Sequence, residues 1–563
     1  MKKITALLLA MLMIVSMSTA MAGSAAPDWK PYDELIKQIK SSTDFVEREA
    51  LMHKAEDMLM ETGAIMPLYF YNDIYMSKPE FTGHYTNAYG MKHFEYATNG
   101  DKTSARLNIA SEPDKLDPAL NSSVDGAILT MLSFGGLYTY DKDAKLVPHF
   151  ATGYTVSEDG LTYTFDIREG LKWSDGTPID ANDFVYSWKR LVAKDTAADY
   201  SYMAAGIKGY EEGDLAVSAS EDGKQFTVEL SAPCAYMLDL AAFPAFYIVP
   251  KQAVEAAEGY KDADGNVVNP GAWAQAAGYP VCGPYQLTAW DHDVSMTYSK
   301  NPNFYDAENV KLETLEFMLT ADATVAYAAY QAGDLDFIDG VPTDEIAKVI
   351  DSPEFFNAPQ LGTYYVCFNV NSPLFEGKTP EQANAMRKAL SLLVDRDYIV
   401  ETIGQTGQHP ANAFIPEGMA DGHGGIFKTN DEDYKYPNEE YVGYFTLSDD
   451  VEAKTAEAIE LLKSAGYEFE NGKLSANTPI SFEYLTNTGD AHEAIAQAMQ
   501  QDFAAIGIEM KVKSIDWKVF LNERKAGNFD IARNGWIADF DDPINMLEMW
   551  TTDSGNNDVQ FGK

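Results

Sequence analysis

Residues 151–190 read ATGYTVSEDGLTYTFDIREGLKWSDGTPIDANDFVYSWKR, and this stretch carries the clearest structural pattern in the chain. Apolar residues occupy every second position of 161–167, directly after the turn Ser-Glu-Asp-Gly at 157–160. Alternation with period two after a glycine turn predicts a β-strand with one buried face. The same turn recurs at 220–223, and a second alternating segment, QFTVEL, follows it at 225–230. We therefore expect two strands here.

Segments further along the chain have helical periodicity instead. Residues 386–400 (MRKALSLLVDRDYIV) place apolar side chains at helical spacing. Residues 455–465 are amphipathic and end on Gly466, a residue typical of the position just after a helix. Residues 33–60 contain a further helical pair. Because helices and strands are mixed along the whole chain, the predicted fold class is α/β.

The bulk composition limits the possible functions. A chain of 563 residues with 46% hydrophobic content is too long for one ordinary core and predicts two to four domains or lobes. The net charge is −44, from 86 acidic and 42 basic residues. Such a surface repels phosphate backbones, so we expect no nucleic-acid partner. Solubility alone explains the acidity, which is not taken as a sign of a cationic ligand.

The first residues have the composition of a secretion signal. Lys2 and Lys3 precede the apolar run 4–17, and Ala20-Met21-Ala22 has the small-x-small pattern of a cleavage site. Residues 1–22 are therefore predicted to be a signal peptide. The run is too short to span a membrane comfortably, and no cysteine lies near the cleavage site to accept a lipid anchor. We expect a mature protein outside the cytoplasm, periplasmic or secreted.

The sequence contains no recognised catalytic or metal-binding motif. The eight histidines are dispersed, and neither His-Glu-x-x-His, Gly-x-Ser-x-Gly nor a phosphate loop occurs. The three cysteines have no zinc or redox spacing. We therefore expect no cofactor, no metal site and no enzymatic activity. One enzymatic alternative remains, a secreted glycosidase that uses Asp539 with Asp541 or Asp542 as its carboxylate pair.

Residues 151–190 closely resemble the signature of the peptide- and nickel-type solute-binding proteins of ABC importers, called family 5. The matching features are the Ser-Glu-Asp-Gly turn, the Thr-Tyr-Thr-Phe strand and the block LKWSDGTPIDANDFVYSWKR. Four further blocks resemble this family in the same order: 111–118 (SEPDKLDP), 282–285 (CGPY), 387–399 and 534–547 (NGWIADFDDPINML).

The resemblance implies a two-lobed periplasmic-binding-protein fold, type II, with an extra domain. Residues 32–98, however, resemble the C-terminal end of the family and not its beginning. The chain order therefore looks circularly permuted, with the usual start and end joined near 99–102. The domains expected in this order are a ligand-binding lobe of 27–72 plus 362–563, a hinge-side lobe of 73–134 plus 251–361, and an inserted domain of 135–250.

The resemblance also implies a function: a monomer that captures short peptides between its lobes and delivers them to the permease subunits of an ABC transporter. A free peptide is a zwitterion, so its enclosure requires an anion for the ammonium and cations for the carboxylate. Family members are also known to bind oligosaccharides or metal chelates, and these ligands remain the alternatives.

Seven residues match ligand-binding positions of the family. Asp539 matches the carboxylate that pairs with the peptide ammonium, and Trp536 lines the same place. Arg533 and Arg524 match positions that receive the peptide carboxylate, for which the guanidinium fork is well suited. His492, Tyr200 and Tyr365 match a carboxylate-side position and two aromatic positions that touch the peptide backbone. Where some relatives carry a disulfide, this chain has Gly362 and Ile537.

Overall fold

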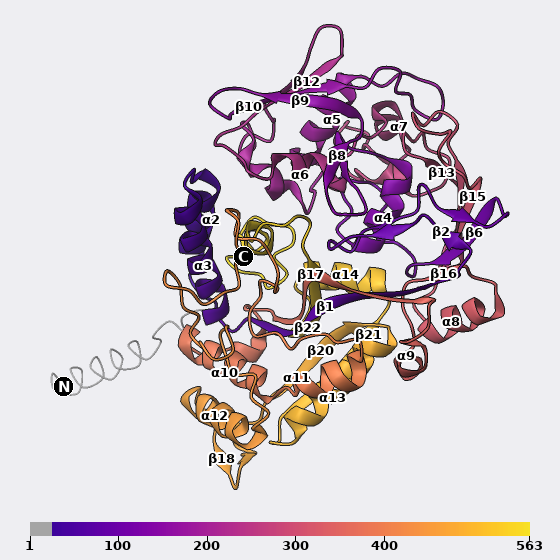
Figure 1. Ribbon diagram of the computed structural model, residues 1–563. Coiled ribbons are helices and arrows are strands. Elements are labelled where there is room, and N and C mark those ends of the chain that lie inside the picture. The colour runs from indigo at the N-terminus through magenta and orange to yellow at the C-terminus, as the bar shows by residue number, and fades with distance from the viewer. Residues whose placement is uncertain (1–24) are drawn as a thin grey trace.

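The computed structural model describes residues 25–563, so the predicted signal peptide, 1–22, lies outside the described residues. Helices and strands alternate throughout this range, and the predicted α/β class is confirmed (Figure 1). None of the helices in 25–563 is long and apolar enough to cross a membrane. All three cysteines are free thiols, so no disulfide holds the fold together in the described part of the chain.

A ten-stranded mixed sheet runs through the centre of the molecule. Hydrophobic residues of its strands, such as Leu107, Phe317 and Phe337, are almost completely buried. The strands follow one another across the sheet as β13 (Tyr285–Asp291), β14 (Ser295–Lys300), β15 (Thr314–Met318), β6 (Ser104–Asn108), β16 (Phe337–Ile338), β1 (Ile65–Ser77), β17 (Phe355–Phe368), β22 (Ile531–Ile537), β20 (Ser481–Asn487) and β21 (Glu509–Ile515).

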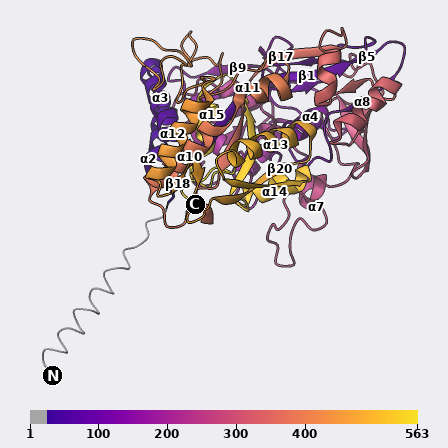
Figure 2. The ribbon, with the colours of Figure 1, turned by 90° about the horizontal axis from the view of Figure 1, so that it is seen from below.

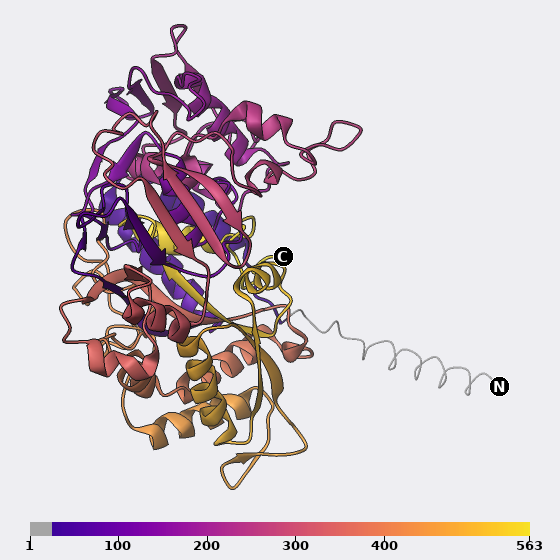
Figure 3. The same cartoon turned by 90° about the vertical axis from the view of Figure 1, so that its right-hand side faces the viewer.

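The antiparallel strands β1 and β17 join the two halves of this sheet. At one end of β1, Met76 pairs with Ile338 of β16. On the side of β17 that faces away from β1, residues Gly362 to Phe368 of β17 pair with β22. In the side view of Figure 3, the rose strands near residue 300 lie above the golden strands near residue 500. Both strands pass through the predicted lobe boundaries at 72/73 and 361/362, and the register of β1 shifts between Phe70 and Asn72.

A four-stranded antiparallel sheet forms within the predicted inserted domain, in the upper part of Figure 1. Its strands are β11 (Val217–Ala219), β12 (Gln225–Glu229), β10 (Thr162–Ile167) and β9 (Ala151–Val156). The two strands predicted from the repeated turn are β10 and β12, and Phe165 lies opposite Phe226 with both rings fully buried. Helix α5 (Ala181–Val192) begins at a capping box formed by Asp180 and Asp183.

The helix predicted at 386–400 is interrupted. Helix α10 (Pro380–Leu393) stops because Val394 is extended, and the Asp395 side chain then caps a new short helix, α11 (Arg396–Tyr398), by accepting from Tyr398 N. A π-helical turn continues from Ile399 to Gly404. Helix α12 (Val451–Ser464) agrees with the prediction, and Gly466 has a positive φ of 91°. Figure 2, seen from below, shows α10, α12, α13 (Asp490–Ala504) and α14 (Trp517–Lys525) on the side of the molecule that faces the viewer.

The predicted N-terminal helical pair is α2 (Lys30–Ser41) and α3 (Phe45–Glu61), and it packs against the last segment of the chain (Figure 1). Trp29 Nε1 donates to the carbonyl of Trp550 at 2.8 Å, and its ring stacks on Phe561 at a centroid distance of 3.8 Å. Asp33 accepts a hydrogen bond from the backbone of Thr552. These contacts are the ones expected from the permuted order, while the permutation itself stays a prediction.

The remaining elements are short and connect the parts described above. The helices among them are α4 (Val124–Ser133), α6 (Met237–Ala242), α7 (Lys251–Ala256), α8 (Ala323–Ala332), α9 (Thr343–Val349) and α15 (Ile544–Leu547). The strands are β2 (Phe81–Thr82), β3 (Tyr85–Thr86), β4 (Lys92–His93), β5 (Thr98–Asn99), β7 (Tyr138–Tyr140), β8 (Leu146–Pro148), β18 (Phe469–Glu470) and β19 (Lys473–Leu474).

Candidate ligand-binding site

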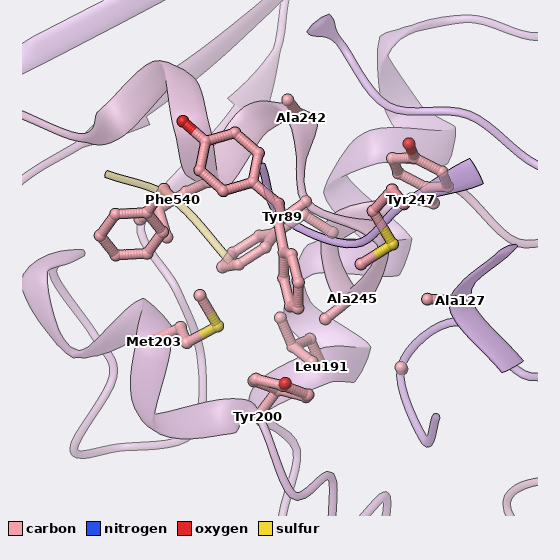
Figure 4. Packing of buried hydrophobic residues seen from close by; sticks show 14 of the residues in the cluster. Tyr89, Ala127, Leu191, Tyr200, Met203, Ala242, Ala245, Tyr247 and Phe540 are labelled. Atoms are coloured by element: carbon pink, nitrogen blue, oxygen red, sulfur yellow. The ribbon is translucent and has the colours of Figure 1, made fainter. Parts of the chain in front are cut away.

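A cavity of about 530 Å³ lies where the central strands meet α4, α14 and the segment after β22. This volume is within the range of about 300–1,000 Å³ that is typical of small-molecule sites. Figure 4 shows Tyr89 and Tyr200, two of its lining residues, in a packed cluster with Phe540. Six of the seven residues predicted from the resemblance line the cavity: Asp539, Trp536, Arg533, Arg524, His492 and Tyr200.

Asp539 is a buried carboxylate with neutral partners. Only 7% of it is exposed, and it makes no ion pair with any described residue. Asn545 Nδ2 donates to Oδ2 at 3.0 Å, and the Tyr200 hydroxyl lies 3.4 Å from Oδ1. Burial raises the pKa of Asp539 to about 7, although the hydrogen bond from Asn545 opposes this shift. A ligand cation at this position would supply the charge that the protein leaves unpaired.

Asn545 orients the carboxylate and the neighbouring indole together. Its Oδ1 accepts from Trp536 Nε1 at 3.1 Å and from the backbone of Asp539 at 2.9 Å. With both bonds made to Oδ1, the amide nitrogen is directed to Asp539. The sequence reasoning missed Asn545. The only available signal was its position six residues after Asp539, in α15.

Arg533 is the cation that lacks a protein counter-ion. It lies on β22 and is half-buried, with its guanidinium 5.2 Å from the ring centre of Tyr364 and 5.6 Å from that of Trp517. It makes no ion pair with any described residue, and its buried Nε has no hydrogen-bond partner. The surrounding tyrosine and tryptophan rings hold the guanidinium in place, and its positive charge stays available for an anionic group of a ligand.

The other two predicted carboxylate-side residues differ from Arg533. Arg524 is already paired, because its Nε lies 2.8 Å from Asp558 Oδ2, and both residues line the cavity. His492 Nδ1 lies 3.1 Å from the Tyr364 hydroxyl. Burial, with a contribution from Arg533, lowers the pKa of His492 well below its usual value. A neutral His492 offers a ligand a hydrogen bond and no charge.

Tyr365 is the predicted site residue that the structure does not place on the cavity. Alternate residues of a strand face opposite sides, so Tyr364 and Tyr365 point apart. Tyr364 faces Arg533, whereas the fully buried ring of Tyr365 packs edge-on against Phe414 and Trp550. In this structure, Tyr365 therefore belongs to the core behind β17 and is not among the residues that line the cavity, while its contact with a ligand stays a prediction.

Two further features of the cavity were missed by the sequence reasoning. Lys92 is buried between Asp73, at 2.9 Å, and Asp339, at 3.0 Å, and all three line the cavity. Gly535 lies beside the Tyr71 hydroxyl, and a Cβ at this position would collide with that oxygen. Because Lys92 and its partners are distant in sequence from β22, no local pattern connected them to the site.

The aspartates of the glycosidase alternative do not form a carboxylate pair in the cavity, because Asp541 and Asp542 are bound to other protein groups. Asp542 accepts two hydrogen bonds from Arg48, each of 2.8 Å, and both residues are buried. Asp541 accepts from the backbone of Ala420 at 2.8 Å. Among these three aspartates, only Asp539 lines the cavity. The cavity therefore does not contain the carboxylate pair that this alternative requires.

Comparison with known proteins agrees with this geometry. The sequence profile of the family described as bacterial extracellular solute-binding proteins, family 5 Middle, matches residues 145–558. This protein belongs to that family. Its members are binding proteins, so the family 5 protein described here is classed with solute binders and not with enzymes.

Individual relatives cover most of the chain. The oligopeptide-binding protein OppA of Bacillus subtilis is 32% identical over 81% of this chain and 79% of its own length. The periplasmic oligopeptide-binding protein OppA of Salmonella typhimurium is 30% identical over 82% of this chain and 79% of its own. Among solved structures, the murein tripeptide binding protein MppA of Escherichia coli has a TM-score of 0.70 at 27% identity, covering 82% of this chain and 84% of that one.

Proposed function

We propose that this family 5 protein captures short peptides between its two lobes and delivers them to the permease of an ABC importer. The proposal is carried by one observation: the cavity contains a buried carboxylate without a cation, Asp539, and a guanidinium without an anion, Arg533. A zwitterionic ligand satisfies both, whereas a neutral sugar leaves two charges unpaired in a desolvated place. The glycosidase and oligosaccharide alternatives are therefore not favoured.

The spacing of the two charges supports a short peptide. Arg533 and Asp539 are six positions apart, the first within β22 and the second two residues beyond its end. At roughly 3.3 Å per residue, their Cα atoms are at most about 20 Å apart. An extended ligand also advances about 3.3–3.6 Å per residue, so the Cα separation corresponds to about six extended residues, to which the reach of the two side chains is added.

Similar proteins support the same ligand class. A solved structure of OppA from Haemophilus influenzae, a complex with RPPGFSPFR, has a TM-score of 0.70 at 27% identity and covers 82% of this chain and 85% of its own. The two OppA relatives carry oligopeptide binding in their names. We extend this ligand class to the present chain, together with a monomeric state, a signal peptide at 1–22 and a place outside the cytoplasm.

The circular permutation and the domain boundaries are part of the proposal. The contacts of Trp29 with Trp550 and Phe561 support the assignment of 27–72 to the same lobe as 362–563. The pairing of Met76 with Ile338 supports a crossing of the chain to the hinge-side lobe after residue 72. In this scheme β1 and β17 are the strands about which the lobes move when they close on a ligand.

Calorimetric titration with chemically blocked tripeptides tests the function. Tri-alanine should bind, N-acetyl tri-alanine should lose most of the affinity through Asp539, and the C-terminal amide should lose it through Arg533. Mass spectrometry of small molecules released by denaturing the purified protein identifies the natural ligand class. Intact peptides are expected. Equal binding of blocked and free peptides, or the release of oligosaccharide alone, would overturn the proposal.

A further inference from the structure

Three potential metal ligands gather beside α3, outside the lining of the ligand cavity. Glu49 belongs to α3, and Asp421 and His423 lie in a loop that packs on it. One ligand atom from each residue lies within 4.8 Å of the others. His423 Nε2 is 2.6 Å from Glu49 Oε2 and 3.7 Å from Asp421 Oδ2. None of the three lines the cavity of the proposed peptide site.

A second, buried histidine points at the same carboxylate. His53 lies one helical turn after Glu49, and its Nε2 is 3.7 Å from Glu49 Oε1. His53 is 3% exposed, makes no hydrogen bond with any described residue, and has a buried Nδ1 without a partner. Its ring is stacked between Phe427 and Tyr434, with centroid distances of 3.9 and 3.7 Å. The core thus holds an unpartnered imidazole against Glu49.

We propose that His53, His423, Glu49 and Asp421 form a binding site for one divalent transition-metal ion of the zinc type. Two imidazoles with two carboxylates are a nitrogen-and-oxygen ligand set that suits zinc and its neighbours, whereas magnesium and calcium prefer oxygen alone. The i, i+4 spacing of Glu49 and His53 places both side chains on one face of α3.

The distances among Glu49, Asp421 and His423 suit one ion, whereas the His53 imidazole, which faces the other oxygen of Glu49, must shift towards them to become the fourth ligand. Metal bonds of about 2.0–2.1 Å place neighbouring ligand atoms roughly 3.3 Å apart. The His423–Asp421 distance is 3.7 Å, so this pair needs to close by only a few tenths of an ångström. The His423–Glu49 distance of 2.6 Å must lengthen, because the metal replaces the proton that these two atoms share.

The local charge and exposure also favour a dication. Glu49 and Asp421 carry two negative charges, and the adjacent Arg48 is neutralised by Asp542. His53 is buried with its Nε2 directed at Glu49, so its imidazole is positioned to act as a ligand. The His423 side chain is 32% exposed, while those of Glu49 and Asp421 are 16% and 8% exposed. An ion can therefore enter past His423.

The test uses untagged, chelator-treated protein and Zn²⁺ alone, without any peptide, so its result is independent of the proposed function. Calorimetric titration should give about one Zn²⁺ per chain, and Mg²⁺ should give no binding. H423Q and E49Q should each weaken Zn²⁺ binding by more than about tenfold. The matched control is H409Q, because His409 belongs to an exposed pair with Glu417, 2.8 Å away and outside the cluster. H409Q should bind Zn²⁺ like the unmodified protein.

A spectroscopic measurement separates this site from adventitious binding. Co²⁺ in place of Zn²⁺ should give the visible absorption of a four-coordinate ion, and H53Q should alter that spectrum while H409Q does not. H53Q removes a core residue, so circular dichroism must first show that this variant is folded. If H53Q is not folded, E49Q replaces it in the Co²⁺ measurement. Absence of Zn²⁺ binding, or an equal loss in H409Q and H423Q, would overturn the proposed site.

Discussion

At the scale of single residues, the site depends on which charges the protein leaves unpaired. Neither Asp539 nor Arg533 forms an ion pair with a described residue, while Arg524 and Lys92 are each held by carboxylates. An unpaired group in a desolvated cavity gains more from a charged ligand than a group that must first break an existing ion pair. We therefore expect Asp539 and Arg533 to dominate the affinity.

Replacing Asp539 by Asn should weaken tripeptide binding by about 2–5 kcal/mol, or more than about thirtyfold, because the enclosed ammonium loses its counter-charge. Asn keeps the size of the side chain, so the circular dichroism spectrum should not change. Calorimetric titration measures the loss. Asp541→Asn is the matched control, since Asp541 does not line the cavity, and it should bind the peptide normally. Unchanged affinity in Asp539→Asn would refute the assigned role.

The pH dependence of binding follows from the same carboxyl group. Burial raises the pKa of Asp539 to about 7. Between pH 5 and 7 the group must lose its proton to pair with an ammonium, so affinity should rise with pH across this range, with release of up to one proton per peptide. Asp539→Asn should show a much flatter profile. An affinity that falls from pH 5 to 7 would contradict this prediction.

The stability of the ligand-free protein should change in the opposite direction. An acid whose pKa is raised in the folded state holds its proton more tightly there than in the unfolded chain, so it favours folding at low pH. This contribution is lost as the pH rises from the unfolded value towards about 7. Without peptide, Asp539→Asn should therefore unfold at a higher temperature than the unmodified protein at pH 8, as measured by calorimetry. A lower unfolding temperature would argue against an unpaired, buried Asp539.

At the scale of elements, α3 is fixed to the segment after β22 by a buried ion pair. Arg48 and Asp542 form two hydrogen bonds of 2.8 Å, and both are almost fully buried. Removing one partner leaves the other charge buried and alone. Asp542 is three residues from Asp539. The pair therefore also connects α3 to the segment whose Asp539 is proposed to bind the peptide ammonium.

Asp542→Asn should lower the free energy of unfolding by about 3–5 kcal/mol, measured by urea denaturation, because Arg48 then remains desolvated without a counter-charge. The matched control is Glu61→Gln on the same helix. Glu61 is exposed and pairs with Lys388 at 2.7 Å, so its loss should change stability by only about 0–1 kcal/mol. Equal effects of the two substitutions would show that the buried pair is not the main anchor of α3.

At the scale of the whole molecule, peptide binding should stabilise the closed arrangement of both lobes. A ligand that binds only the native state adds about 2.7 kcal/mol at a hundredfold excess over Kd. Scanning calorimetry should therefore show a higher unfolding temperature with tri-alanine. N-acetyl tri-alanine, which lacks the ammonium, should have little effect. If both peptides raise the unfolding temperature equally, the ammonium contact with Asp539 does not contribute to binding.

The permuted order makes a prediction about connectivity. If 32–98 is the family's C-terminal segment, moving 25–98 to follow Lys563 should preserve the fold and the peptide affinity, because the same contacts of Trp29 and Asp33 form through a different peptide bond. Calorimetry and circular dichroism measure the result. A chain that lacks 25–62 altogether is the control, and it should unfold because the lobe loses the buried face formed by Leu35, Ile36 and Ile39. Failure of the relocated chain to fold would contradict the permutation.

Much of the local structure was predictable from the sequence because turns, caps and apolar periodicity act over a few residues. Strands β10 and β12 and helices α2, α3 and α12 all lie where periodicity placed them. The break after Leu393 was not predicted, since the Asp395 cap competes with an apolar pattern that continues through it. The mixed α/β class followed from the helices and strands predicted along the chain, and the family followed from 151–190 and the four other blocks.

Charge pairing and side-chain direction were decided only by the tertiary structure. The sequence assigned Arg524 and Arg533 the same role, yet Asp558 reaches one and no carboxylate reaches the other. Tyr365 matched a family position, but the pleat of β17 turns it into the core and turns Tyr364 to Arg533. The electrostatic energy of a group depends on distance and burial, and both are set by segments that are far apart in the chain. Periodicity therefore determined the elements, and only their packing determined which charges stay free for a ligand.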